Sequence, residues 1–545
     1  MPPRRPLRRS ARGFDLSSSP QPFRLRVCAL RKGLPLQKTT EATARMKVLF
    51  ATSEFADFSK SGGLGEVAAG LPRALRKLGA DVRILMPGYP SVLAKASEVR
   101  LIGQLPGRAG IAPCRLGQVR TIDGMIVYVL LAPALYQRRG TAYSRPDGTD
   151  WPDNDLRMGR LSLAAADIAC GRGGAAWQPD VLHVNDWPGG LAPAYLRWEG
   201  APIRTLLSVH NLGHQGVFSA DHRHGLGIPE QAFGIEGVEF HGNVSFLKAG
   251  LYYADHVCAV SPTYAREITT EALGGGLHGL TQGLAARGQL DGIVNGIDEG
   301  WNPTSDPYLP VRFGPADLGG KQPTADLVRT SLCLAPSDGP LFGVVSRLVQ
   351  QKGLDFVAEV GGEIVREGGQ IAILGLGEPE TELLLNRLSR RHRDHIGVLV
   401  GFNEPMAHRI LAGSDFLLMP SRFEPCGLTQ MQAQRMGTLP VAHETGGLAD
   451  TIEDGVTGFL FRDLSPEGLL GACRRAFAAF MDPEQLATMR RAAMRRHVGW
   501  ALAAGQYMQR YAHLSGQPIP EPSREADRPD PTATRPGELL RLVAA

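Results

Sequence analysis

The sequence predicts an α/β protein with two doubly wound parallel sheets that face each other across a cleft. Short apolar runs rich in β-branched residues alternate with helical stretches, which is the pattern of parallel strands joined by crossover helices. The alternation occurs in two series, and a polar segment from Trp301 to Gly339 without a clear strand separates them. With 545 residues, the chain is also too long for one ordinary domain.

The first series of candidate strands lies before residue 301. Its apolar runs are Val48–Ala51, Val82–Met86, Met125–Leu131, Val181–Val184, Thr205–Val209 and His256–Val260. Helical stretches follow at Glu66–Leu78, Leu161–Ala169 and Val244–Tyr253. We therefore expect a first doubly wound domain over residues 46–300.

The second series begins after Pro340. Its runs are Leu341–Val345, Ile371–Leu374, Val398–Val400, Phe416–Met419 and Leu439–Ala442. They predict a second domain over residues 301–514, with the segment after Trp301 as the linker. Because ligands of doubly wound sheets bind at the carboxyl ends of the strands, we expect the binding residues of both domains to face the cleft.

The net charge of +5 belongs to the beginning of the chain. Residues 1–45 carry a net charge of +9, and the other 500 residues sum to −4, so no nucleic-acid partner is needed to explain the basic excess. The basic segment has the composition of an organelle transit peptide, but Met46–Phe50 reads like a natural protein start, which favours an upstream mis-start. We expect residues 1–45 and 515–545 to be disordered.

Composition also bears on the compartment. The hydrophobic share of 43% and the charged share of 21% are those of a soluble globular protein. The seven cysteines are scattered without metal-ligand spacing, which indicates reduced thiols in the cytoplasm, or in a plastid if the basic segment is a transit peptide. No apolar run approaches the roughly 18 residues of a membrane span. The oligomeric state is open.

A glycine-rich corner follows the first strand, at Lys60-Ser61-Gly62-Gly63-Leu64-Gly65. Glycine lets backbone N–H groups approach a ligand, and the following helix points the positive end of its dipole into the same space. Lys60 adds a full positive charge. The corner is therefore either an anion cradle or a turn with glycines for geometry only.

A second basic corner follows the first strand of the second series. Arg347 and Lys352 stand five residues apart at the end of a strand, and Gly353 and a helix follow. Two such cations can bind a diphosphate together, although most arginine and lysine side chains are solvated charges on the surface.

Two more loops of the second series directly follow strands and carry residues that could bind a sugar or a phosphate. Glu424 precedes Cys426-Gly427-Leu428, where a helix with free N–H groups can begin. A carboxylate beside a phosphate-binding helix end makes sense if Glu424 addresses the sugar. Thr445-Gly446-Gly447 is a similar anion-friendly turn, although Gly-Gly turns are common.

Polar residues also end two strands of the first series. Asp186 belongs to the segment His183–Trp187, and His210 and Asn211 follow the next strand. Each alone is more often a structural residue than a ligand. Together, at the carboxyl ends of one sheet, they can hold several sugar hydroxyls.

On these residues the chain resembles bacterial glycogen synthases and plant starch synthases. The family's Lys-Thr-Gly-Gly-Leu loop appears as residues 60–64, with Ser61 for threonine, and its Glu-Pro-Cys-Gly-Leu-Thr-Gln segment stands unchanged at 424–430. Segments 244–255, 259–265 and 295–298 also fit. The likeness runs from about Met46 to about Leu514 and departs from the family at Pro188, where many members have histidine.

The resemblance implies a GT-B fold of two Rossmann-like domains and a glucosyltransferase of glycogen biosynthesis. Such an enzyme transfers glucose from ADP-glucose to the non-reducing end of an α-1,4-glucan, with retention of configuration and release of ADP. It also implies that glucan approaches from the first domain and donor from the second.

The resemblance also assigns roles. Lys60, Gly62 and Gly63 would touch the donor, as would Asn211 and the turns of Cys426-Gly427-Leu428 and Thr445-Gly446-Gly447. The implied catalytic residues are Arg347 and Lys352 on the diphosphate, Glu424 near the transferred glucose, and His210 and Asp186 on the other side of the sugar.

No metal or other cofactor is expected. Arg347 and Lys352 can stabilise the leaving ADP, and the Asp153-Asn154-Asp155 string matches a family segment without a metal role. No residue is an obvious covalent nucleophile, which favours front-face attack. The alternatives are a UDP-glucose-using transferase, a glycan phosphorylase, for which no pyridoxal-phosphate segment is seen, and a non-catalytic glucan-binding protein.

Overall fold

The computed structural model describes residues 45–520. The predictions about the two ends, namely disorder over 1–45 and 515–545 and a transit peptide or upstream start, fall almost entirely outside these residues. Within them, no helix is both long and apolar enough to cross a membrane.

A nine-stranded sheet forms the first half of the fold, in the order β12-β11-β7-β6-β1-β2-β5-β4-β3. Its strands are β1 (Lys47–Ala51), β2 (Asp81–Pro87), β3 (Arg100–Leu105), β4 (Cys114–Arg120), β5 (Ile126–Leu131), β6 (Val181–Asn185), β7 (Arg204–Val209), β11 (His256–Ala259) and β12 (Leu290–Gly292). All neighbours pair in parallel except β3 with β4 and β4 with β5, which form an antiparallel edge. Three of these strands, β3, β4 and β12, do not correspond to any apolar run predicted from the sequence.

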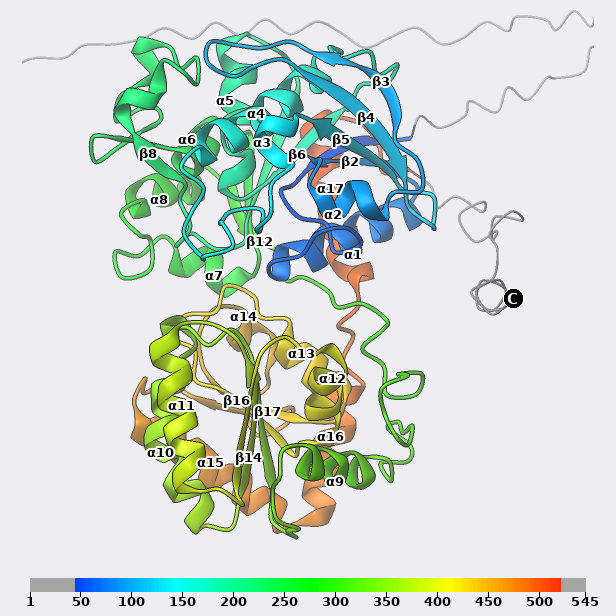
Figure 1. The fold of residues 1–545 in the computed structure, drawn as a ribbon, viewed down its shortest axis with the longest axis vertical. Coiled ribbons are helices and arrows are strands. Elements are labelled where there is room, and N and C mark those ends of the chain that lie inside the picture. Colours follow the sequence, from blue (N-terminus) through cyan, green and yellow to red (C-terminus); the bar gives the residue numbers. More distant parts are fainter. Residues whose placement is uncertain (1–44, 521–545) are drawn as a thin grey trace, which may run out of the picture. The chain divides into compact units, whose positions relative to one another are not determined.

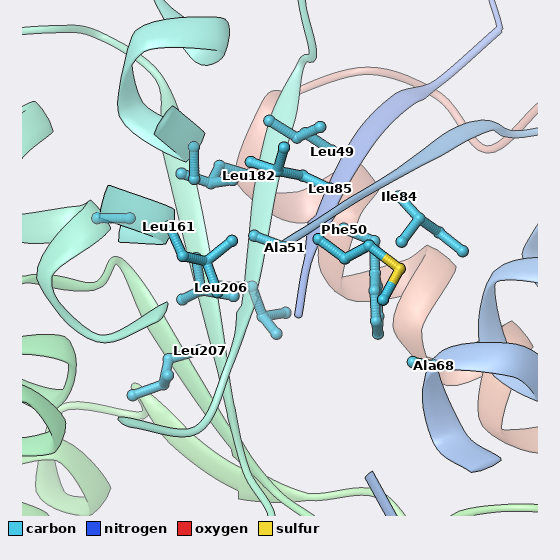
Figure 2. Close-up of a cluster of buried hydrophobic side chains, with 14 of the residues drawn as sticks. Leu49, Phe50, Ala51, Ala68, Ile84, Leu85, Leu161, Leu182, Leu206 and Leu207 are labelled. Carbon is cyan, nitrogen blue, oxygen red and sulfur yellow. The ribbon is translucent and has the colours of Figure 1, made fainter. Parts of the chain in front are cut away.

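Helices cover both faces of this sheet. They are α1 (Gly63–Lys77), α2 (Pro90–Lys95), α3 (Pro133–Tyr136), α4 (Asn154–Ala169), α5 (Leu191–Trp198), α6 (Phe246–Tyr253), α7 (Pro262–Glu267) and α8 (His278–Ala286). Figure 2 shows Leu161 of α4 and Ala68 of α1 approaching the central strands, which carry Phe50 and Leu182, from opposite sides. Apolar packing on both faces explains why these strands are continuous apolar runs.

One predicted helix begins later than expected. The segment Val244–Tyr253 was predicted to be helical throughout, but α6 begins at Phe246. Val244 and Ser245 belong instead to β10 (Asn243–Ser245), which pairs with β8 (Val217–Ser219) and β9 (Glu239–Phe240) in a small sheet. The Ser245 hydroxyl accepts the N–H of Lys248, so this residue ends the strand and caps the helix.

The second half of the fold is a six-stranded parallel sheet in the order β15-β14-β13-β16-β17-β18. Its strands are β13 (Leu341–Val345), β14 (Gln370–Gly375), β15 (Ile396–Val400), β16 (Phe416–Met419), β17 (Leu439–His443) and β18 (Phe459–Phe461). The strand order reverses between β13 and β16, as in a dinucleotide-binding sheet. The predicted fold class, two doubly wound α/β sheets, is confirmed by this topology.

The helices of the second sheet divide between its two faces. They are α9 (Lys321–Ser331), α10 (Leu354–Arg366), α11 (Pro379–Arg391), α12 (Glu404–Gly413), α13 (Thr429–Arg435), α14 (Gly446–Thr451), α15 (Pro466–Phe480) and α16 (Pro483–Met494). Figure 1 shows α10 and α11 on one side of the strands and α9 and α12 on the other. The predicted linker therefore contains a helix, since Val328 of α9 packs in the core with Ile410 of α12.

The last helix, α17 (Trp500–Ser515), returns to the first sheet and lies beside α1 (Figure 1). Its Tyr507 and Tyr511 are fully buried in the core of the first sheet. The domain boundaries remain a prediction, but the range 301–514 placed this helix with the second sheet, where it does not pack. We call the nine-stranded sheet with its helices, α17 included, the first lobe, and the six-stranded sheet with its helices the second lobe.

Hydrogen bonds hold α17 on the first sheet. The Tyr511 hydroxyl lies 2.7 Å from His183 Nδ1, and His183 Nε2 lies 2.7 Å from the Ser208 hydroxyl, which also bonds Tyr507 at 3.0 Å. Burial lowers the pKa of His183 well below its usual range, so the ring is neutral and needs one donor and one acceptor. This network gives His183, Ser208 and the hydroxyls of Tyr507 and Tyr511 hydrogen-bond partners.

Tyr511→Phe tests this network. The variant leaves His183 Nδ1 buried without its partner, so we expect the free energy of unfolding to fall by about 1–3 kcal/mol. Urea unfolding monitored by circular dichroism measures the change. The half-exposed Tyr252→Phe is the control for loss of a tyrosine hydroxyl and should change stability by less than about 0.5 kcal/mol. Equal stability of Tyr511→Phe and the control would contradict the network's role.

Candidate active site

The glycine-rich corner after β1 already holds a carboxylate. Glu54 Oε2 accepts the N–H groups of Ser61 (2.5 Å) and Gly62 (3.0 Å), and Tyr143 donates its hydroxyl to Glu54 Oε1 at 2.8 Å. Lys60 Nζ pairs with Glu66 at 2.5 Å. Two of the backbone amides predicted to be free for a ligand anion, those of Ser61 and Gly62, are thus occupied by a residue of the chain, and donor contacts by Lys60, Gly62 and Gly63 remain predictions.

The two cations of the second basic corner, Arg347 and Lys352, lie in different environments. Lys352 Nζ lies 2.5 Å from Glu424 Oε2, and both side chains are largely buried. Arg347 is exposed, and no carboxylate among residues 45–520 pairs with it. Gly353 adopts a left-handed φ of 62°, and a Cβ there would lie 2.0 Å from the carbonyl oxygen of Pro420, so only glycine brings the corner this close to the end of β16.

The Glu424 side chain is buried with two partners. The Glu424 residue is 6% exposed, and Ser421 donates its hydroxyl to the same Oε2 that Lys352 contacts, at 3.0 Å. The adjacent Cys426 is also buried, which raises the pKa of its thiol to about 12. Cys426 is therefore a neutral thiol and not a nucleophile.

The Thr445-Gly446-Gly447 turn serves the Glu424 loop. Gly447 donates its N–H to the Glu424 carbonyl at 3.0 Å, and a Cβ on Gly446 would lie 2.0 Å from that same oxygen. The Gly446 N–H and the Thr445 hydroxyl both donate to Glu267 Oε1 at 2.9 Å. The glycines therefore allow close packing, and a carboxylate of the first lobe fills the turn predicted to bind an anion.

The first lobe contributes Asp186, His210 and Asn211, as predicted, at the ends of β6 and β7. Asp186 Oδ1 accepts the N–H groups of His210 (2.6 Å) and Asn211 (3.3 Å), and His210 Nε2 lies 3.0 Å from Asn185 Oδ1. The φ of Asp186 is 51°, a left-handed conformation that is uncommon for a non-glycine residue. Such a backbone persists only where the surroundings hold it, here by two amides on one carboxylate.

Burial sets the charges of this group. It raises the pKa of Asp186 to about 7, although the two amide hydrogen bonds oppose the rise, and it lowers the pKa of His210 to about 4. At neutral pH, His210 is thus a neutral imidazole that can exchange hydrogen bonds with a hydroxyl group.

Contacts between the lobes bring the predicted residues together. A Cβ on Gly63 would lie 3.8 Å from Leu428, and one on Gly213 would lie 4.0 Å from the ring of Phe423. The charge of Arg347 also acts on His214, whose pKa is lowered first by burial and then by that charge. The corner after β1, the loop after β7 and the Glu424 loop therefore line one site.

Several residues here were not among the predicted site residues. Glu54, Tyr143 and Asn185 contact the predicted set, and Glu267 occupies one of its turns. Glu54 and Asn185 lie at or just after the carboxyl ends of strands, the same pattern that predicted the other site residues. Tyr143 and Glu267 come from a long loop and a short helix, and no local pattern marks them.

One group of described residues brings three possible metal-ligand atoms close together. One ligand atom each of His256, Cys258 and Asp291, on β11 and β12, lies within 4.8 Å of the other two. Asp291 already accepts from the Cys258 thiol at 3.0 Å and pairs with Arg510 of α17. The predicted site residues are not part of this group, and the expectation that the enzyme needs no metal remains a prediction.

Known families and relatives match most of the chain. Residues 47–283 match the family described as starch synthase catalytic domain, and residues 339–478 match glycosyl transferases group 1. A glycogen synthase of Pseudomonas syringae pv. tomato is 52% identical over 470 residues, which cover 86% of this chain and 97% of that protein. Glycogen synthase 1 of Bradyrhizobium diazoefficiens is 51% identical over 459 residues, 84% of this chain and 99% of that protein.

Solved structures share the fold. The catalytic domain of starch synthase IV from Arabidopsis thaliana, bound to ADP and acarbose, superposes with a TM-score of 0.77 at 29% identity, over 87% of this chain and 100% of that one. Sucrose-phosphate synthase from Thermosynechococcus elongatus superposes with a TM-score of 0.54 at 18% identity, over 87% of this chain and 100% of that one.

Asp186→Asn tests the raised pKa of Asp186. The folded state keeps this proton up to about pH 7, whereas an unfolded aspartate loses it near about pH 3.9. Between these values the folded state binds more protons, so the carboxyl group contributes stability that falls as the pH rises. The free energy of unfolding of the wild type minus that of the variant should fall by up to about 1.4 kcal/mol per pH unit in this window.

Urea unfolding across the window measures this difference. The lowered pKa of His210 has the opposite effect, because its stabilising contribution grows as the pH rises, but it is present in both proteins and cancels. A difference that does not change with pH would show that Asp186 titrates normally.

Proposed function

The chain belongs to the family of glycogen synthases and is a glucosyltransferase with the GT-B fold, and from this premise we propose that its donor is ADP-glucose. Glucose passes to the non-reducing end of an α-1,4-glucan with retention of configuration, and ADP leaves. The observation that carries the proposal is the exposed Arg347, which pairs with no carboxylate of the described residues, at the point where the strand order of the second sheet reverses.

The donor diphosphate fits this point for electrostatic reasons. Arg347 offers a bidentate cation to phosphate oxygens, and Lys352 supplies a second charge one turn away. Both follow β13, and the Glu424 loop follows the adjacent β16. Negative charge that develops on the leaving ADP therefore meets the exposed cation of Arg347, with Lys352 beside it in its ion pair with Glu424, and we propose that the reaction needs no metal.

The same edge of the sheet offers a surface for the nucleobase. Leu376, directly after β14, is 57% exposed, and Phe402, just after β15, is 81% exposed. An exposed aromatic ring at the carboxyl ends of these strands can stack on a base. This agrees with the ADP bound to the starch synthase relative.

Glu424 lies where it can act on the glucose. Positive charge develops at the anomeric carbon as the bond to phosphate breaks, and a fixed carboxylate stabilises it. The neutral His210 can hydrogen-bond a glucose hydroxyl from the first lobe. Because the Cys426 thiol is neutral and Glu424 is held by Lys352, attack by the glucan hydroxyl on the same face as the departing ADP fits better than a covalent intermediate.

The glucan acceptor fits the first lobe. Tyr143 lies against Trp187, with ring centroids 6.0 Å apart, and its hydroxyl contacts Glu54. Aromatic faces beside a carboxylate suit the apolar faces and hydroxyls of a glucose unit. We place the enzyme in the cytoplasm, since the six cysteines among the described residues are all free thiols.

A donor comparison tests the proposal. Purified protein with glycogen and an excess of EDTA should transfer glucose from ADP-glucose with a kcat/KM at least roughly 100-fold above that from UDP-glucose, as expected when a site is built to hydrogen-bond one base. Release of ADP or UDP measures each rate. Equal or reversed preference would reject ADP-glucose as the donor, and inhibition by EDTA would reject the metal-free mechanism.

Glu424→Gln tests the catalytic carboxylate. The variant keeps an oxygen for Lys352 and Ser421 but removes the charge, so kcat should fall roughly 10²- to 10³-fold while the Kd for ADP changes little. Steady-state kinetics and calorimetry measure the two. Ser421→Ala, which removes a neutral hydrogen bond to the same oxygen, is the matched control and should cost less than about tenfold. An equal loss of kcat in both variants would show that the negative charge of Glu424 is not needed for catalysis.

A further inference from the structure

The backbone of the Glu424 loop is held at every carbonyl from Phe423 to Gly427. Residues of the second lobe bind four of these oxygens: Gln351 Nε2 donates to Phe423 O, Gly447 N to Glu424 O, and Gln430 Nε2 to Cys426 O and Gly427 O, at 2.8–3.0 Å. The fifth, Pro425 O, accepts from the Ser261 hydroxyl of the first lobe at 2.7 Å.

Ser261 is well placed to hold this oxygen. It precedes α7 as its N-cap, and its hydroxyl oxygen also accepts the N–H of Tyr264 at 3.2 Å. The side chain is fully buried, so no water competes for the bond to Pro425. One hydroxyl therefore fixes the start of α7 and the residue after Glu424 at the same time.

The other end of α7 contacts the same loop indirectly, through the turn Thr445-Gly446-Gly447. Glu267 Oε1 holds the Gly446 N–H and the Thr445 hydroxyl, and the next amide, Gly447 N–H, holds the Glu424 carbonyl. Gly446 packs on that carbonyl so closely that a Cβ would lie 2.0 Å away. A shift of Glu267 would thus move the turn on which Glu424 rests.

From these contacts we propose that Ser261 and Glu267 are positioning residues, through which the first lobe sets the Glu424 carboxylate against the donor sugar when the lobes are in contact. The inference rests on the catalytic role proposed for Glu424. It explains why a first-lobe helix of six residues, Pro262–Glu267, contacts the second lobe at both ends.

A third contact of α7 supplies the control. Thr263 donates its N–H and its hydroxyl to Asp450 at 2.8 and 2.7 Å. This contact also joins the lobes, but it bonds no atom of residues 423–427. Thr263→Val therefore removes a hydroxyl-mediated contact between the lobes, two residues from Ser261, without touching the Glu424 loop.

The first experiment compares Ser261→Ala, Ser261→Gly and Thr263→Val. Both Ser261 variants should lower kcat roughly 10- to 100-fold with KM for ADP-glucose nearly unchanged, because a misplacement of about 1 Å at a reacting group has that effect. Glycine is nearly as good an N-cap as serine, so an equal loss in Ser261→Gly assigns the effect to the Pro425 contact and not to helix capping. Thr263→Val should stay within about threefold of the wild type.

Two results would overturn the proposal. One is a kcat of the Ser261 variants within about threefold of the wild type. The other is an equal loss in Thr263→Val, which would mean that any contact between the lobes serves as well.

The second experiment separates geometry from charge at Glu267. Glu267→Ala should lower kcat as the Ser261 variants do, whereas Glu267→Gln keeps an acceptor oxygen for Gly446 and should restore most of the rate. A loss in Glu267→Gln as large as in Glu267→Ala would show that the charge matters and not the position, and would reject the positioning role.

Amide hydrogen exchange tests the geometry without turnover. In the wild type bound to ADP, the Gly447 amide should exchange slowly, and it should exchange faster in Ser261→Ala and Glu267→Ala but not in Thr263→Val. Unchanged exchange in the first two variants would contradict the proposal. A wild type that does not use ADP-glucose would reject the proposed donor, while this readout would still report whether α7 holds the loop.

Discussion

The burial of one carboxylate shapes the second lobe around the site. A buried charge needs a partner of opposite sign and hydrogen bonds for its other lone pairs. Glu424 obtains these from Lys352 and Ser421, and both must approach from neighbouring strand ends. Lys352 can approach only because Gly353 turns the chain against the Pro420 carbonyl, at the reversal of the strand order. The Lys352–Glu424 ion pair therefore depends both on the glycine at position 353 and on the strand order of the sheet.

The chain's own carboxylates occupy two of the turns that suit an anion. Glu54 accepts the amides of Ser61 and Gly62 in the glycine corner, and Glu267 accepts the Gly446 amide and the Thr445 hydroxyl in the other turn. Backbone N–H groups removed from water must find acceptors, and an internal carboxylate provides one at all times. In both cases the carboxylate also orients something else, Tyr143 in the first lobe and the Glu424 loop in the second. Arg347 is left as an exposed cation at the reversal of the strand order.

The two lobes depend on each other in both directions. The second lobe's chain returns to the first as α17, and a neutral, buried His183 with two tyrosine hydroxyls holds it there. The first lobe in turn extends α7 to the second, where Ser261 contacts the Glu424 loop and Glu267 contacts the turn that supports it. Residues of the two lobes meet at Gly63 with Leu428 and at Gly213 with Phe423. Such an arrangement suits a reaction whose two substrates approach from opposite sides.

The sequence by itself determined the two sheets, most of their strands, and the strand ends that carry Lys60, Asp186, His210, Arg347 and Glu424. Apolar runs, glycine corners and polar strand ends are local patterns, and parallel topology brings all carboxyl ends to one edge. Only the tertiary structure decided which of these groups are free and which are paired. That Lys352 binds Glu424, that Glu54 and Glu267 fill the anion turns, and that α17 crosses back all depend on contacts between residues far apart in the chain, which no local pattern encodes.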